Sequence, residues 1–168
     1  MQDLITTPLP TSRFELIART HALLLYQIMR LFDGNIQARA AAEATRPALE
    51  NAAIALLEHI TFDASPPSGT ACAENLSLYP LNTTREFWQN WVFQESARRT
   101  FLITFFMLQL YRYLSGDIPL QCDGRMYRCY SWTLSAYLWQ APDVVDFTLA
   151  WKQKNHFVMT STKYVYLP

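Results

Sequence analysis

The feature that most constrains the fold is residues 84–114, a long segment that contains neither glycine nor proline. Thr83-Thr84-Arg85-Glu86 at its start fits a capping box, in which hydroxyl and carboxylate oxygens accept from first-turn amides. The pattern predicts one helix from Thr84 to Leu114, about 45 Å long at the standard rise. Apolar and aromatic side chains occur on every side of this helix, which predicts burial all round and a central place in the fold.

Two further helices are expected before this segment. Ser12-Arg13-Phe14-Glu15 fits a capping box, and a mostly buried helix should follow as far as Phe32. Asp33-Gly34-Asn35 then predicts a tight turn and a new N-cap. The alanine-rich stretch 36–60 favours a second helix, with a kink or restart near Thr45 because Pro47 lacks an amide donor.

The remaining segments divide the chain. Residues 61–83 are rich in proline and small polar residues and predict a flexible loop between two subdomains. After a turn at 116–119, residues 122–129 are typical of a loop or short strand, and 131–140 and 143–156 predict two helices separated by Pro142. The last segment is compatible with a strand or an extended tail.

These patterns together predict an all-α fold, a single helical domain of about five to six helices around a long buried central helix. The expected organisation is an N-terminal arm (1–11), an N-terminal helical part (12–60), the loop (61–83), a central and C-terminal helical part (84–156) and a C-terminal tail (157–168). Three tryptophans are expected in the core, namely Trp88, Trp91 and Trp139.

Composition excludes several classes of protein. Hydrophobic residues make up 51% and charged residues 17% of the 168 residues, which is too apolar for an intrinsically disordered chain. Lysine plus arginine and aspartate plus glutamate both number 14, so the net charge is zero and a phosphate-backbone binder is disfavoured. The most apolar run, 101–110, is half as long as a membrane span. The N-terminus does not resemble a signal peptide, so we expect a protein that is not secreted.

The cysteines do not predict a metal centre. Cys72, Cys122 and Cys129 are three in number and contain no CxxC pair. Cys122 and Cys129 are compatible with half of a zinc site completed by a distant histidine, but a closed site needs four ligands and no second close pair exists. We therefore expect neither metal ligands nor a metal ion.

No catalytic motif is present either. The sequence has no glycine-rich nucleotide motif and no HExxH, so no cofactor is expected. His21 is interpreted as a satisfied core or interface histidine rather than a catalytic base. His59 and His156 lie near predicted helix C-termini, where a histidine side chain interacts favourably with the helix dipole. No residue is assigned a catalytic role.

One charged cluster interrupts the apolar central helix. Glu95 and Arg99 have the i, i+4 spacing of an ion pair, and Arg98 lies beside them. Buried charges need partners. A structural ion-pair network is the favoured interpretation, and a pocket for a carboxylate or phosphate ligand is the alternative.

Two blocks of sequence carry a family likeness. The first runs from Leu16 through His21 and Asp33-Gly34-Asn35 to Glu43, and the second includes Trp88-Gln-Asn-Trp91, Glu95-Ser-Ala-Arg98-Arg99 and Leu138-Trp139-Gln-Ala-Pro142. In this order they resemble the helical regulatory region of fungal zinc-cluster transcription factors, especially regulators of secondary-metabolite gene clusters. Members of that family normally carry six cysteines that hold two zinc ions in a DNA-reading module, and no such pattern occurs in this chain.

The resemblance implies a regulatory or interaction domain that binds a protein partner or a small effector, with no direct DNA contact and no membrane, in the nucleus or cytoplasm. An alternative belongs to another class. The chain is 14% aromatic, which is compatible with a small helical non-metal enzyme, or a cyclase-like helper, that shapes a metabolite in an aromatic-lined cavity. Aromatic residues also fill cores, and no acid–base pair is recognisable.

Overall fold

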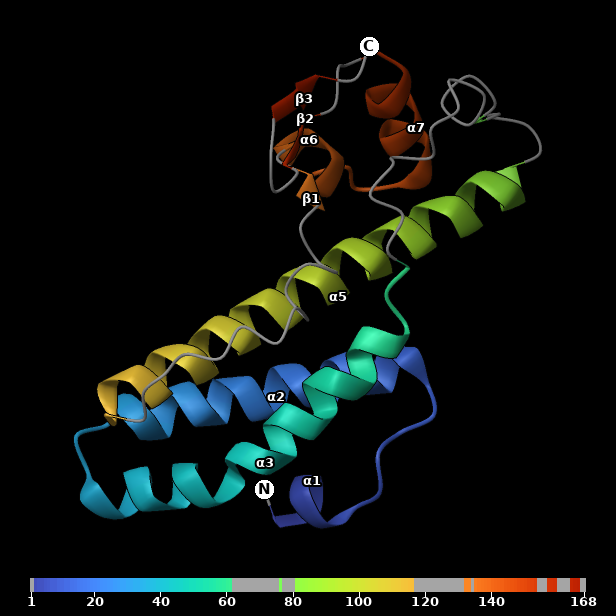
Figure 1. Ribbon diagram of the computed structural model, residues 1–168. Coiled ribbons are helices and arrows are strands. Elements are labelled where there is room, and N and C mark those ends of the chain that lie inside the picture. The colour runs from blue at the N-terminus through green and yellow to red at the C-terminus, as the bar shows by residue number, and fades with distance from the viewer. Residues whose placement is uncertain are drawn as a thin grey trace. The chain divides into compact units, whose positions relative to one another are not determined.

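We describe a computed structural model of the chain, covering residues 2–61, 76, 81–116, 132–133, 135–153, 157–159 and 164–166. Six helices occur within these residues, and they confirm the predicted all-α class (Figure 1). The described strands form one small antiparallel sheet. Two compact units are present: unit 1 comprises 1–60 and 97–126, and unit 2 comprises 61–96 and 127–168.

Unit 1 begins with α1 (Gln2–Thr6) and α2 (Arg13–Phe32). Ser12 is the N-cap of α2, as expected, but its side chain makes no capping hydrogen bond, so the capping-box prediction is wrong in this detail. The chain before α2 is held by another residue. The Arg19 guanidinium donates to the carbonyl oxygens of Thr7 and Pro8, at 2.7 Å each.

The turn between α2 and α3 (Ile36–Glu58) confirms the sequence prediction. Gly34 has φ 77°, and the Asn35 side chain accepts hydrogen bonds from the amides of Gln37 and Ala38, at 2.8 and 3.3 Å. Helix α3 is continuous through Pro47, so the predicted restart does not occur. In Figure 1 the ribbon of α3 changes direction partway along, as a proline inside a helix favours.

The longest helix is α5 (Leu81–Leu114), which gives its first part to unit 2 and its second part to unit 1. It begins three residues before the predicted Thr84, so the second capping box lies inside the helix. A proline directly before the first helical residue, such as Pro80 here, is compatible with a helix start.

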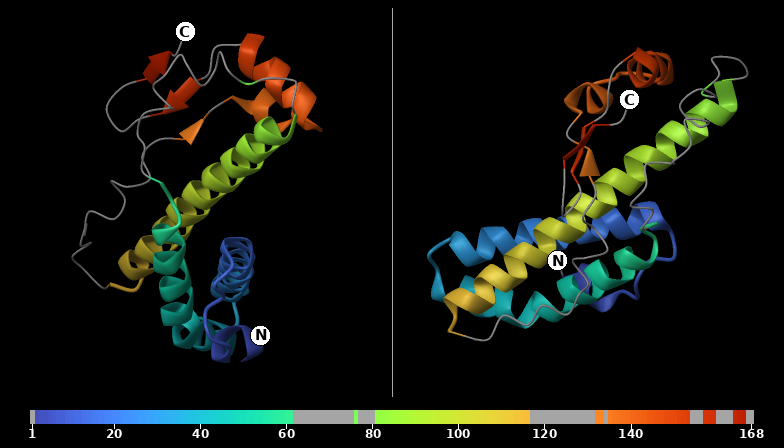
Figure 2. Two further views of the ribbon diagram at one scale, coloured as in Figure 1. Left: turned by 90° about the vertical axis from the view of Figure 1, so that its right-hand side faces the viewer. Right: turned by 45° about the horizontal axis from the view of Figure 1, so that its top comes forward.

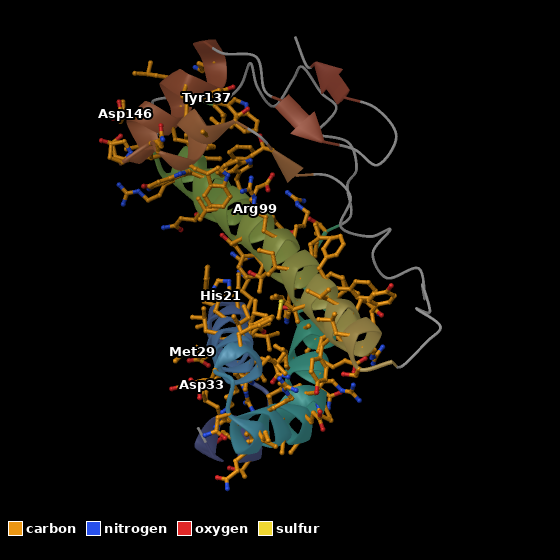
Figure 3. The ribbon with its side chains drawn as sticks, turned by 90° about the vertical axis from the view of Figure 1, so that its left-hand side faces the viewer. His21, Met29, Asp33, Arg99, Tyr137 and Asp146 are labelled. Carbon is orange, nitrogen blue, oxygen red and sulfur yellow. The ribbon has the colours of Figure 1, made fainter. Side chains whose placement is uncertain are left out.

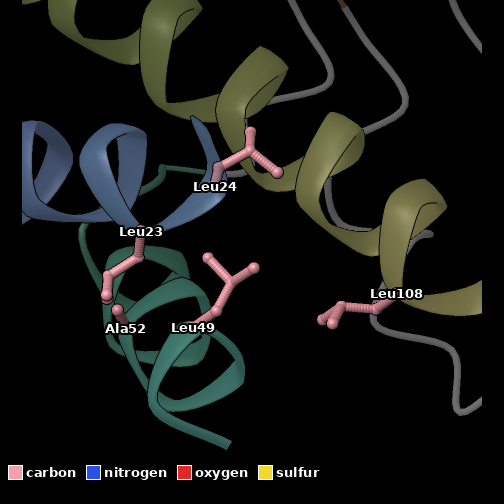
Figure 4. Close-up of a cluster of buried hydrophobic side chains, with 5 residues drawn as sticks. All are labelled: Leu23, Leu24, Leu49, Ala52 and Leu108. Carbon is pink, nitrogen blue, oxygen red and sulfur yellow. The ribbon is translucent and has the colours of Figure 1, made fainter. Parts of the chain in front are cut away.

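The core of unit 1 lies where α2, α3 and the second part of α5 meet (Figure 2). Its buried side chains are Leu23, Leu24, Leu49, Ala52 and Leu108 (Figure 4). Burial of α5 is not complete here, because one stripe of apolar residues faces solvent. These residues are Ile103, Phe106, Leu110, Tyr113 and Leu114. The prediction of burial all round is therefore wrong for this part of the helix.

Unit 2 contains the strands. Residues 131–140 were expected to form one helix, but they contain strand β1 (Trp132–Thr133) and the short helix α6 (Ala136–Trp139). Strand β1 pairs with β2 (Phe157–Met159), which pairs with β3 (Tyr164–Tyr166), both antiparallel. The pairing of Trp132 with Met159 explains the difference, because a partner distant in sequence replaces local helix hydrogen bonds. It also gives strands to part of the segment 157–168.

Helix α7 (Val144–Gln153) begins where the sequence predicts. The Asp143 carboxylate accepts from the amides of Val145 and Asp146, at 2.9 Å each, which satisfies two donors of the first turn. The predicted end of this helix at His156, the segment 122–129 and all but Thr61, Leu76 and 81–83 of the predicted loop lie outside the described residues.

Candidate functional site

The residues singled out by the sequence fall into both units. The division of α5 lies between Ser96 and Ala97, so Glu95 belongs to unit 2, and Arg98 and Arg99 belong to unit 1. We therefore describe the surroundings of Glu95 separately from the two arginines. Both arginines are half-buried.

Glu95 is 3% exposed and lies close to strand β1. Its Oε1 accepts a hydrogen bond of 2.6 Å from the backbone amide of Thr133. The Thr133 hydroxyl in turn accepts from the amide of Ser135 at 3.3 Å. A buried carboxylate thus anchors the chain that leads into α6. This contact gives Glu95 a structural role, while an ion-pair network with Arg98 and Arg99 stays a prediction.

An aromatic cluster lies beside this anchor in unit 2. The Trp91 ring is 5.3 Å from Trp139 and 5.2 Å from Phe147, and Trp88 is 6.2 Å from Phe147, between centroids. Trp151 completes the cluster at 5.5 Å from Phe147. Phe147 is fully buried, whereas the rings of Trp88, Trp91 and Trp139 are half-buried. The cluster therefore joins α5, α6 and α7 by ring packing.

His21 is held by a hydrogen bond within unit 1. Its Nε2 lies 2.5 Å from the Oγ1 of Thr100, a buried residue of α5. Figure 3 labels His21 on α2. The imidazole thus links α2 to α5, and its Nε2 takes part in a structural hydrogen bond. His59 ends α3 as its C-cap residue. His156 lies outside the described residues.

A small cavity lies between α3 and α5 in unit 1. Its walls combine apolar and polar side chains, and the Thr104 hydroxyl and the Gln109 carbonyl on its lining have no hydrogen-bond partner among the described residues. The space open to the centre of a water molecule is about 30 Å³. Such a volume accommodates one or two water molecules, which would satisfy the two polar groups. It is too small to shape a metabolite.

Two further pairs join the same helices. The Tyr111 hydroxyl donates to the Glu43 carboxylate. Burial, together with this hydrogen bond, raises the pKa of Tyr111 above its ordinary value of 10.0. Arg112 forms an ion pair with Glu50 at 3.4 Å, and both side chains are about one-third exposed. These contacts reinforce the packing of α5 against α3.

Two classes of site were also sought within the described residues. In that part of the chain no group of three His, Cys, Asp or Glu side chains could hold a metal ion. Cys72, Cys122 and Cys129 lie outside it. None of the described helices combines the length and the apolar character needed to cross a bilayer.

Comparison with known proteins gives one informative likeness. The chain is 32% identical over 155 residues to transcription factor gsfR2 of Penicillium aethiopicum. The match covers 92% of this chain but only 35% of the relative, so the chain spans about a third of that protein's length. No family model matches the chain. No solved structure matches it either.

Proposed function

We propose that the chain is a regulatory domain of the transcription-factor type, acting in the control of fungal secondary metabolism. The observation that carries this proposal is the likeness to a fungal transcription factor along 92% of the chain. The domain works by binding a protein partner or a small effector, and its place of action is the nucleus. Activities of the rest of that longer relative are not transferred to this chain.

The proposal includes no direct contact with DNA. A net charge of zero supports this part, because binding to the phosphate backbone draws on an excess of lysine and arginine. Two polar side chains also have structural partners, namely the buried Glu95 carboxylate at Thr133 and the ring of the exposed His21 at Thr100. These contacts suit a packed module whose surface does the recognition.

Deletion of the gene tests the regulatory role. Transcripts and metabolites are measured in the deletion strain and in a strain complemented with the intact chain. A regulator predicts a joint fall of the transcripts of one pathway, restored on complementation. Unchanged transcripts with one accumulated metabolite, converted by the purified protein, would replace the proposal with the small helical enzyme.

An electrophoretic mobility assay tests the second part. The purified chain is titrated onto promoter fragments of the affected genes at low and at physiological salt. We expect no sequence-specific shift at either concentration. A specific complex that weakens steeply with salt would show that this domain itself binds DNA, because counterion release gives that dependence.

A further inference from the structure

Helix α2 has two opposite apolar faces, and only one of them is buried in the core of unit 1. The buried face includes Leu16, Leu23 and Leu31. On the other face Leu25, Met29 and Phe32 are 61%, 66% and 64% exposed. Figure 3 shows Met29 on the side of α2 that points away from α3. An amphipathic helix of a self-contained globule normally has a polar outer face, so this face needs an explanation.

The spacing of the outer face indicates what covers it. Ala18, Ala22, Leu25, Met29 and Phe32 follow one another at intervals of 4, 3, 4 and 3 residues. This alternation is the a/d pattern of a heptad seam, which forms where one helix lies along another. Ala18 is exposed and Ala22 is half-buried, so both are within reach of a neighbouring helix.

We propose that α2 pairs with α2 of a second copy of this chain, in antiparallel orientation. In the register that aligns a with d positions, Ala22 lies opposite Leu25 of the copy, and Ala18 lies opposite Met29. These layers each combine a small side chain with a large one, which fills space without voids. At each end of the seam the same register sets Phe32 opposite Glu15 of the copy, so the self-complementary part of the seam is its four central layers.

A parallel pair is much less favourable. It sets Phe32 against Phe32, Ala18 against Ala18, and the Glu15 carboxylate against that of the copy. The antiparallel pair instead separates the two Glu15 side chains to opposite ends, where each lies opposite Phe32 of the copy, and it opposes the helix dipoles favourably. Charge and side-chain size therefore select the same orientation.

The exposed stripe of α5 does not match itself in this way. Ile103, Phe106, Leu110 and Tyr113 are all large, so a second copy would bring large side chains against large ones. Helix α2 therefore carries the proposal. Its 20 residues span about 30 Å. A pair of helices of this length buries less surface than the roughly 1,600 Å² of a standard interface. We expect association in the micromolar range.

Sedimentation equilibrium of the intact chain tests the interface. The wild-type chain should form dimers reversibly as its concentration rises, and Leu25→Glu should weaken dimerisation at least about tenfold because a carboxylate would be buried in the seam. Phe106→Glu is the matched control, since it changes a similarly exposed apolar residue on α5. Circular dichroism of each variant verifies its helices.

Mixing two variants tests the register. Leu25→Glu in one copy and Ala22→Lys in the other create a single Glu–Lys layer and leave one native Ala–Leu layer. The mixture should dimerise more tightly than either variant alone. A wild-type chain that stays monomeric at hundreds of micromolar, dimers abolished by Phe106→Glu but not by Leu25→Glu, or a mixture without rescue would each overturn the proposal.

Discussion

At the scale of single residues, Glu95 has a specific structural role in unit 2. Its carboxylate accepts from the amide of Thr133 in a fully buried setting. Removing the acceptor leaves a buried donor without its partner, a change that costs more than the net value of a hydrogen bond. A charged residue in an apolar helix is thus explained by a backbone amide far away in the sequence.

Replacing Glu95 with alanine should lower the free energy of unfolding by about 1–3 kcal/mol. Glu95→Gln should cost less, because its amide oxygen still accepts from Thr133. Urea denaturation followed by circular dichroism measures both. Glu86→Ala, an exposed position on the same helix, is the control and should change stability by less than about 0.5 kcal/mol. Equal losses at positions 86 and 95 would contradict the buried bond.

Tyr111 gives a prediction about pH. Because its pKa is raised in the folded state, the protonated hydroxyl stabilises the fold fully below the ordinary value of 10.0, and this stability is lost as the pH rises through the folded pKa. Tyr111→Phe should therefore cost about 1 kcal/mol at pH 8, and less above pH 10. Urea denaturation at both pH values measures the difference. A cost that grows with pH would show that the sign is wrong.

At the scale of elements, the turn between α2 and α3 is set by local chemistry. Gly34 has φ 77°, and a side chain added there would contact nothing within 4 Å. The cost of Gly34→Ala is therefore conformational, about 1–2 kcal/mol in unfolding free energy. Gly34→Asn should cost less, since asparagine tolerates this backbone region. Thermal denaturation of both variants checks the order, and equal stability of Gly34→Ala and the wild type would refute it.

At the scale of elements, tertiary contacts can also override the local secondary-structure preference of a segment. The segment 131–140 has helical character in sequence, yet Trp132 and Thr133 form a strand because β2 supplies partners for their backbone. The aromatic cluster also depends on packing between elements, since Trp91, Trp139 and Phe147 come from three helices. Tertiary pairing overrides propensity when the intrinsic preference is weak.

At the scale of the whole molecule, the cysteine content of the chain differs from that of the DNA-reading module of the family that its sequence resembles. Two zinc ions in that module need six thiolates, and this chain has three cysteines. We predict that the purified protein contains no stoichiometric zinc and keeps its helical circular dichroism in chelator. One zinc per chain by elemental analysis, with melting on chelation, would make Cys122 and Cys129 candidate ligands.

The sequence by itself determined the three longest helices and the turn between the first two of them. The absence of glycine and proline from 84–114 specifies α5, and Asp33-Gly34-Asn35 specifies the turn before α3, because these signals act within a few residues of the chain. It also marked Glu95 as a charge that needs a partner. The roles of Arg98 and Arg99 stay predictions.

Only the tertiary structure decided which faces are buried and which distant groups meet. Residues all round α5 are apolar, so no local pattern distinguishes its buried side from the stripe at Ile103 and Phe106. The bond between Glu95 and Thr133 joins residues 38 positions apart, and the strand at Trp132 depends on a segment near the C-terminus. Such contacts depend on how elements pack against one another, which hydrophobic periodicity within one element does not encode.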